Sequence, residues 1–187
     1  MSPDQVVTQA KDKFTGAVAH YHEQMKTIRT GRAHASMLDS VMVVVYGVPT
    51  PLMHVANVTA PEPQMLQITP FDPGNLQQIV SAIRDNQNLG MNPSDDGRVV
   101  RVPVPPLNEE RRREIVKQLG NKQEDAMIAL RNVRHEAMEA FDNAKKDKTI
   151  GEDDAKRYSG LVEDAMQKAR TEIEEATKAK EVEIMKV

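Results

Sequence analysis

Apolar residues recur at intervals of three and four along the N-terminal stretch, from about Ser2 to Arg29. This spacing places them on one face of a helix. The face comprises Val7, Ala10, Phe14, Ala17, Tyr21, Met25 and Ile28. Ser2 can cap the start with Pro3 at the first position, and Gly31 can adopt the left-handed conformation that ends a helix. We therefore predict one long amphipathic helix before Gly31.

The same periodicity returns after Pro106 and predicts two more long helices. Asn108 can cap the first of them. Its apolar face comprises Ile115, Leu119, Ala126, Leu130, Val133, Ala137 and Phe141. After a break at residues 147–151, the second has an apolar face comprising Tyr158, Val162, Ala165, Ala169, Ile173 and Ala176. Three such faces can bury one another, so we predict an elongated three-helix bundle.

The middle of the chain has a different pattern, with frequent prolines and no lysine between Thr27 and Val116. The β-branched run at residues 40–46 predicts a strand, as do the shorter segments 55–59, 65–69 and 98–102. The turn at Pro61–Pro63 would separate the second strand from the third. Asp72 can cap one short helix, with Leu76, Ile79, Val80 and Ile83 on a single face. This block is predicted to be a small β-rich domain with one short helix.

Glycine and proline mark the two places where the chain would pass between these parts. Thr30 and Gly31 lie on the way into the middle block, and Pro105 and Pro106 lie on the way out. The predicted fold is therefore α+β, with residues 1–30 and 106–187 forming a discontinuous bundle and residues 31–105 an inserted domain. Two short connections restrict twisting more than stretching, so we expect these four residues to form a hinge.

Composition narrows the possible functions. The formal net charge is −3, from 25 lysines and arginines against 28 aspartates and glutamates. This near-balance argues against a general polyanion binder but allows RNA contacts through a few placed arginines. The chain has no cysteine, which excludes disulfides, thiolate metal sites and cysteine nucleophiles. With neither a signal-peptide pattern nor a membrane-spanning apolar run, we expect a soluble, cytoplasmic protein.

The residues that usually carry catalysis are poorly arranged for it. The five histidines are His20, His22, His34, His54 and His135, and no two have the i, i+4 spacing of a helical zinc site. The carboxylates of the last helix alternate with lysines, as on a solvated face. No phosphate-binding glycine loop is present in the sequence. We predict no catalytic residue, no metal site and no cofactor, and an enzyme is the weakest of three hypotheses.

Four arginines are better candidates for a binding site. Arg131 and Arg134 lie three residues apart on a predicted helix and so occupy neighbouring surface positions. Arg29 and Arg32 bracket the expected hinge. The planar guanidinium can donate two parallel hydrogen bonds to a phosphate. The alternative is that these arginines are solvated and paired with Glu124 or Glu136.

A series of short motifs, in order along the whole chain, resembles the ribosome recycling factor family. The motifs are Ile28–Ala33, Tyr46–Leu52, Ala56–Thr59, Leu89–Pro93, Arg101–Leu107, Glu109–Arg112, Leu130–Arg134 and Gly151–Asp154. Each is short, but the ordered set is specific. His135 departs from the pattern, because many members have another basic residue after the second arginine.

The resemblance implies an L-shaped protein with a three-helix bundle as the long arm and a β/α/β domain as the short arm. It implies that the bundle contacts large-subunit ribosomal RNA of a bacterial-type ribosome after termination. Elongation factor G, with GTP hydrolysis by that partner, would then help to separate the subunits and release mRNA and tRNA. Family members use arginines matching Arg29, Arg131 and Arg134 for RNA contacts, and we extend this to Arg32.

The resemblance thus implies a non-enzymatic, monomeric factor in translation that binds neither DNA nor a membrane. The rival hypothesis is a coiled-coil adaptor or chaperone cofactor that holds a protein partner through the inserted domain. The two differ in what they expect of the arginines, because the adaptor would not depend on them.

Overall fold

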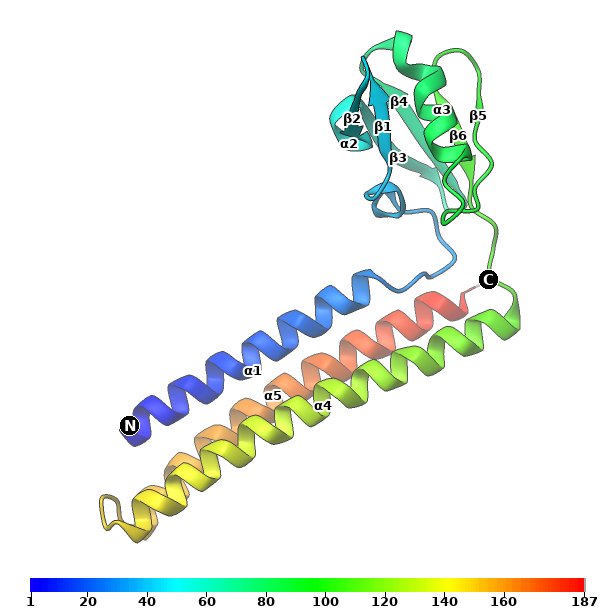
Figure 1. Ribbon diagram of the computed structural model, residues 1–187. Coiled ribbons are helices and arrows are strands. Elements are labelled where there is room, and N and C mark those ends of the chain that lie inside the picture. Colours follow the sequence, from blue (N-terminus) through cyan, green and yellow to red (C-terminus); the bar gives the residue numbers. More distant parts are fainter. Residues whose placement is uncertain (187) are drawn as a thin grey trace. The chain divides into compact units, whose positions relative to one another are not determined.

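The computed structural model describes residues 1–186, which fall into two compact units (Figure 1). One unit joins residues 1–30 to the residues from 109 onward, and the other spans Gly31–Asn108. The first is built from long helices, and the second has antiparallel sheet with short helices. The α+β class predicted from the sequence is confirmed.

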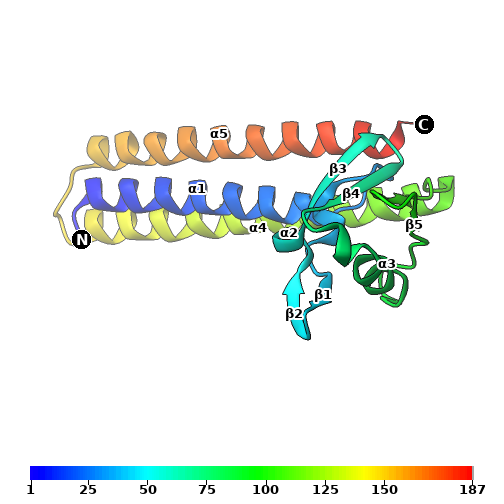
Figure 2. The same cartoon turned by 90° about the horizontal axis from the view of Figure 1, so that it is seen from above.

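Three helices make up the first unit and lie side by side in both views (Figures 1 and 2). They are α1 (Pro3–Lys26), α4 (Glu109–Lys146) and α5 (Glu152–Met185). At the usual rise per residue α4 is about 57 Å long, and it continues without a break through Gly120. α4 runs antiparallel to both neighbours, and the three helices form the predicted bundle.

The predicted apolar faces supply the interior of the bundle. The residues of the predicted faces that are buried in the structure are Val7, Ala10, Phe14, Tyr21 and Met25 of α1, Ile115, Leu119, Leu130, Ala137 and Phe141 of α4, and Tyr158, Val162, Ala169 and Ile173 of α5. Phe141 and Tyr158 stack with ring centroids 5.9 Å apart. Ala126, Val133, Ala165 and Ala176 are only partly buried and lie at the edges of these faces.

The two ends of α1 differ in how well the sequence predicts them. Ser2 and Gln5 form a capping box, in which each side chain accepts a hydrogen bond from the other residue's backbone N–H. At the other end α1 stops at Lys26, so the expectation that it reaches Arg29 is wrong. The N–H groups of Thr27 and Ile28 bond three residues back, at 3.2 Å each, which tightens and ends the last turn.

One polar pair lies inside the bundle. Tyr21 of α1 is 1% exposed and Thr177 of α5 is 7% exposed, and their hydroxyl groups are hydrogen-bonded to each other. The Thr177 hydroxyl also bonds the carbonyl oxygen of Ile173 at 2.7 Å. Burial raises the pKa of Tyr21, so its hydroxyl stays protonated. The pair fixes α1 against α5 at one register.

The second unit contains a four-stranded antiparallel sheet and a two-stranded hairpin. The sheet order is β3-β4-β6-β5, with β3 (Ala56–Glu62), β4 (Met65–Pro70), β6 (Val100–Pro103) and β5 (Ser94–Asp95). The hairpin pairs β1 (Met42–Val45) with β2 (Val48–Pro51). The helices are α2 (Leu52–Val55), α3 (Leu76–Arg84) and the 3-10 turns η1 (Ala35–Leu38) and η2 (Pro73–Asn75).

Most predicted elements of this unit are present. α3 buries Leu76, Ile79, Val80 and Ile83, the four residues assigned to one face. The Asp72 carboxylate caps η2 rather than α3, since it accepts from the Gly74 N–H at 2.9 Å. The second predicted strand continues through Pro61 to Glu62, so the turn before β4 is formed by Pro63 and Gln64. This differs from the turn expected at Pro61–Pro63.

The sequence pattern does not predict β2, because Pro49 and Pro51 are unusual in a strand. Proline is tolerated here because β2 pairs on one side only, with β1. The turn between them has Tyr46 and Gly47 at φ values of 51° and 77°, as a two-residue hairpin turn of type I′ requires. The Tyr46 hydroxyl donates to the Asp72 carboxylate at 2.7 Å, which lowers the pKa of Asp72 and ties the turn to η2.

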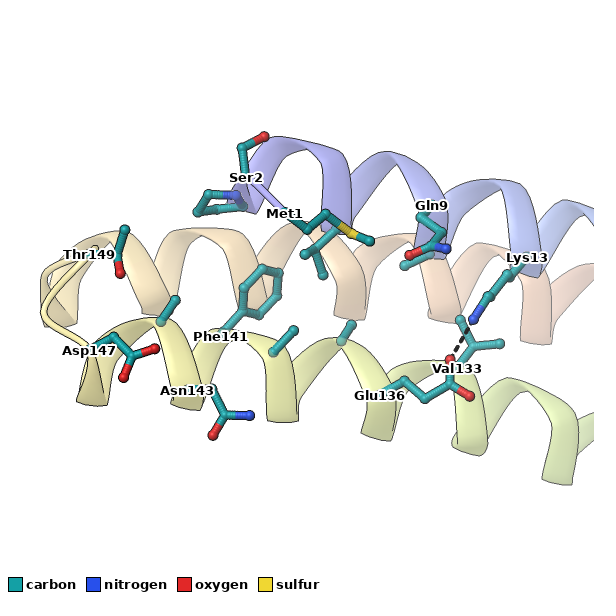
Figure 3. Close-up of a pocket in the computed structure, with 16 residues that line it drawn as sticks. Met1, Ser2, Gln9, Lys13, Val133, Glu136, Phe141, Asn143, Asp147 and Thr149 are labelled. Carbon is teal, nitrogen blue, oxygen red and sulfur yellow. Dashed lines mark hydrogen bonds and ion pairs between the residues drawn. The ribbon is translucent and has the colours of Figure 1, made fainter.

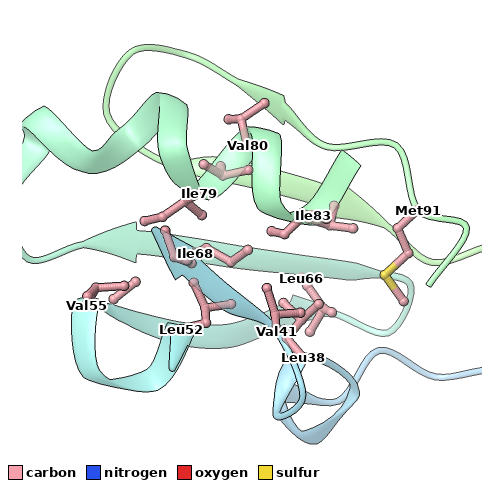
Figure 4. Packing of buried hydrophobic residues seen from close by; sticks show 14 of the residues in the cluster. Leu38, Val41, Leu52, Val55, Leu66, Ile68, Ile79, Val80, Ile83 and Met91 are labelled. Carbon is pink, nitrogen blue, oxygen red and sulfur yellow. The ribbon is translucent and has the colours of Figure 1, made fainter. Parts of the chain in front are cut away.

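The core of this unit lies between α3, the hairpin and the sheet (Figure 4). Its fully buried residues include Leu38, Val41, Val43, Leu52, Leu66, Ile68, Ile79, Ile83, Val100 and Val102. Val41, Val43 and Val45 point inward while Met42 and Val44 are exposed, so β1 has the alternation of a strand with one buried face.

Candidate functional site

Arg134 lies on α4 and reaches across to α5. Its Nε and Nη2 atoms both lie 2.5 Å from Oε1 of Glu163, whose side chain is 46% exposed. Arg134 itself is 44% exposed. Leu130 and Ala137, four residues before and three residues after Arg134, lie on the same side of α4 and are buried, so Arg134 lies at the edge of the packed face of the helix.

Arg131 is attached to its own helix instead. Its Nε donates to the Met127 carbonyl oxygen at 3.4 Å, and Nη2 forms an ion pair with Glu124. The side chain therefore lies along α4 and is 57% exposed. The Glu124 pairing is one of the two alternatives raised by the sequence. Glu136, the other, binds Nζ of Lys13 at 2.5 Å.

Arg131 and Arg134 thus lie at neighbouring positions on α4 and are the candidate binding residues of the bundle. Each guanidinium is ion-paired, yet each is more than two-fifths exposed and has donors outside the ion pair. An exposed ion pair stabilises by only about 0–1 kcal/mol, and the donors outside each pair can bind a phosphate. The arrangement suits recognition of phosphate groups.

Arg29 and Arg32 lie elsewhere. Arg29 follows the end of α1 and belongs to the bundle unit, whereas Arg32 belongs to the second unit. The Lys13–Glu136 contact shows which residues of α1 and α4 lie level with each other. Counted from that pair, Arg29 lies about 20 Å from Arg134 along the bundle. Arg29 therefore lies on a different part of the bundle surface from Arg131 and Arg134.

The segments expected to form the hinge belong to no helix or strand. Gly31 has a φ of 81°, and a Cβ atom there would lie 3.3 Å from Cγ of Leu107. Pro105 and Pro106 are exposed and belong to no helix or strand. The Ala33 N–H bonds the Pro63 carbonyl oxygen at 2.7 Å, and the Val104 N–H bonds that of Gln64 at 2.8 Å. Both connections are thus attached to the same turn of the second unit.

The bundle also has a hollow of about 570 Å³ between α1 and α4, close to the connection from α4 to α5 (Figure 3). Its lining is largely apolar and includes Val133 and Phe141, and the Lys13–Glu136 ion pair crosses one end. Residues 1–186 contain no group of three or more histidines and carboxylates placed to hold a metal. Within the same residues, no helix is both long and apolar enough to cross a membrane.

Sequence reasoning missed Glu163 as part of the site. It lies 29 residues from Arg134 and would have to be found from the packing of α4 on α5. A hint was available, because Glu163 directly follows Val162, which the periodicity assigns to the buried face. A carboxylate at the edge of that face is suited to pair with an arginine at the edge of the neighbouring one.

Two solved structures that resemble this chain are described as ribosome recycling factor structures. The chain matches one described as the solution structure of the ribosome recycling factor, with a TM-score of 0.76, 33% identity and coverage of 100% of this chain and 99% of that one. A second match has a TM-score of 0.65 and 30% identity, with both chains fully covered. It is described as models for the Thermus thermophilus ribosome recycling factor and the Escherichia coli elongation factor G bound to the E. coli post-termination complex.

Sequence comparison defines the family. The model for "Ribosome recycling factor" matches residues 21–185. The ribosome-recycling factor of Corynebacterium glutamicum is 46% identical over 128 residues, which are 68% of this chain and 69% of the relative. That of Bacillus cytotoxicus is 46% identical over 127 residues, which are 68% of each chain. The chain belongs to the ribosome recycling factor family, and the resemblance drawn from the sequence motifs is confirmed.

Proposed function

We propose that this chain binds the post-termination ribosome and, with elongation factor G, promotes separation of the subunits and release of mRNA and tRNA. GTP hydrolysis belongs to elongation factor G, and the chain acts in the cytoplasm as a monomer without catalysing a reaction. The observation that carries this proposal is the family match over residues 21–185. It is supported by a structural neighbour described together with elongation factor G on a post-termination complex.

Large-subunit ribosomal RNA would be contacted by Arg131 and Arg134, with Arg29 and Arg32 as further contacts. The support is geometric, since the two α4 arginines present exposed planar donors from a helix that packing holds in place. Phosphate contacts of this kind set register and orientation rather than sequence specificity. A long rigid bundle would convert a few such contacts into a defined direction on the ribosome.

Thr30, Gly31, Pro105 and Pro106 would form the hinge between the bundle and the inserted domain. Gly31 adopts a left-handed conformation that most residues avoid, and the two prolines have no N–H with which to join a ladder. Both connections are attached to the turn at Pro63 and Gln64. Bending would therefore be confined to the short segments of chain outside these two attachments. Bending at this place would let the inserted domain respond to elongation factor G.

The test is a splitting assay in which light scattering follows purified post-termination ribosomes. Splitting should require the chain, elongation factor G and GTP together. Arg131→Ala and Arg134→Ala should each weaken ribosome binding by roughly tenfold, because a hydrogen bond to a charged group contributes about 1.5–3 kcal/mol. Each should also lower the dependence of binding on salt, by about one in the log–log slope.

Arg157→Ala is a matched control, because Arg157 is 63% exposed and pairs with Asp154 on its own helix. It should bind ribosomes as the unaltered chain does. Loss of helical circular dichroism in an α4 variant would show that the arginine is structural. Failure to split or bind ribosomes with a matched elongation factor G would refute the proposed function.

An adaptor function is the second candidate, and exposed apolar side chains on the inserted domain favour it. Met42, Val44, Tyr46, Val48 and Phe71 are each at least half exposed. An adaptor would bind its protein partner there and would be indifferent to Arg131→Ala. Polar substitutions at Val44 and Phe71 that abolish activity, with no effect from the arginine variants, would favour the adaptor.

A further inference from the structure

The Arg134 guanidinium is fixed along one edge. Nε and Nη2 are directed at the same carboxylate oxygen of Glu163, at 2.5 Å each. Because the guanidinium is planar, this contact sets both the position of the group and the orientation of its plane. The Nη1 donors take no part in it and remain for another acceptor.

Glu163 differs in origin from the partner of Arg131. Glu124 is on the same helix as Arg131, so that pair is local. Glu163 comes from α5, and its neighbour Val162 is fully buried, as is Leu130 near Arg134. Packing of α4 against α5 therefore holds the backbone of Glu163 close to that of Arg134, so that the carboxylate and the guanidinium can meet.

We propose that Glu163 is a positioning residue for Arg134, one that orients the guanidinium so that its Nη1 side is presented to a ribosomal RNA phosphate. The proposal rests on the proposed function, in which Arg134 contacts that RNA. A free arginine loses side-chain freedom when it binds, which weakens an interface by on the order of 2–10-fold per side chain. Glu163 removes much of this loss in advance.

The same carboxylate has an opposing effect, because its negative charge repels a phosphate. The two effects can be separated by substitution. Glu163→Gln keeps an oxygen that accepts from Arg134 but removes the charge, whereas Glu163→Ala removes both. The ratio of the two dissociation constants therefore reports positioning alone, whatever the size of the repulsion.

The experiment measures the affinity of full-length variants for purified bacterial ribosomes. Glu163→Ala should bind about 2–10-fold more weakly than Glu163→Gln. In the Arg134→Ala background the two should bind equally, since no guanidinium remains to be positioned. A purely structural role would weaken binding in both backgrounds, so this comparison separates the two roles.

Glu174 provides a matched control on α5. It lies eleven residues after Glu163, on about the same side of the helix, and pairs with Arg170 of its own helix at 2.8 Å. Glu174→Ala and Glu174→Gln should bind equally. Both residues are at least 44% exposed, so the variants should fold.

Equal affinities for Glu163→Ala and Glu163→Gln would overturn the positioning role, and so would a ratio that persists without Arg134. Unchanged binding of the single Arg134→Ala variant would overturn the RNA contact itself and the positioning role with it. If Arg134→Ala binds weakly while the Glu163 pair is equal, only the positioning role is overturned.

Discussion

The buried hydrogen bond between Tyr21 and Thr177 gives a prediction whose size follows from the structure. The Thr177 hydroxyl has one proton, and it is donated to the Ile173 carbonyl oxygen at 2.7 Å. The Tyr21 hydroxyl must therefore be the donor in its bond to Thr177. Both side chains are less than a tenth exposed, so neither group can turn to water when the other is removed.

The two single substitutions should have unequal effects. Thr177→Val removes the acceptor and leaves the Tyr21 O–H buried without a partner, which costs about 1–3 kcal/mol. Tyr21→Phe removes the donor, while Thr177 keeps its bond to Ile173, so only the net value of one hydrogen bond is lost. That value is about 0.5–1.5 kcal/mol. The double variant should resemble Tyr21→Phe, because it contains no unsatisfied donor.

Urea unfolding followed by circular dichroism at a helical wavelength would measure the three free energies. The double variant should be more stable than the sum of the single effects, by about 1 kcal/mol or more. If Thr177→Val cost no more than Tyr21→Phe, or if the two effects simply added, the donor assignment would be refuted. The variants should all remain helical, since neither substitution changes side-chain volume by much.

Further predictions concern glycines and one carboxylate. Gly120→Ala should raise the free energy of unfolding by about 0.5–1 kcal/mol, because alanine favours a helix more than glycine does and no atom lies within 4 Å of the added Cβ. Gly31→Ala should lower the free energy of unfolding by about 1–2 kcal/mol, because Gly31 has a positive φ and an added Cβ would lie 3.3 Å from Leu107. Urea unfolding that gave changes of the same sign for the two glycine variants would contradict these predictions. Two backbone N–H groups and Arg101 lower the pKa of Asp96 from 3.8 to about 2. The ionised Asp96 carboxylate therefore contributes to the free energy of unfolding above about pH 4, and this contribution is lost as the pH falls through 2. Asp96→Asn should flatten that part of a plot of unfolding free energy against pH. An unchanged plot would argue against the contribution.

The long helices could be predicted from the sequence because their apolar faces repeat many times. One misplaced residue changes little over ten turns, and the bundle follows from faces that have no other partner. Helix ends depend on single bonds instead. The end of α1 at Lys26 is set by short-range bonds of Thr27 and Ile28, which the apolar pattern does not record.

In the inserted domain, local sequence and tertiary pairing disagree at one place. Pro49 and Pro51 argue against a strand, yet β2 forms because β1 offers a partner and the other edge needs none. Tyr46 at a left-handed position is equally unexpected, and its bond to Asp72 helps to hold it there. Such features arise from contacts between distant residues.

The candidate site shows the same division. The positions of Arg131 and Arg134 on one helix follow from their spacing, and the local Glu124 pair was among the alternatives. The Arg134–Glu163 pair could not be predicted, because it requires the register of α4 against α5. Helical period gives the faces of each helix but not how far one helix slides along another.

The attachment of both connections to one turn has a consequence for how the protein can be divided. Ala33 and Val104 bond the adjacent residues Pro63 and Gln64, so the inserted domain begins and ends at the same point. Residues 33–104 are therefore a cassette with adjacent termini, and a short linker could close them into a circle.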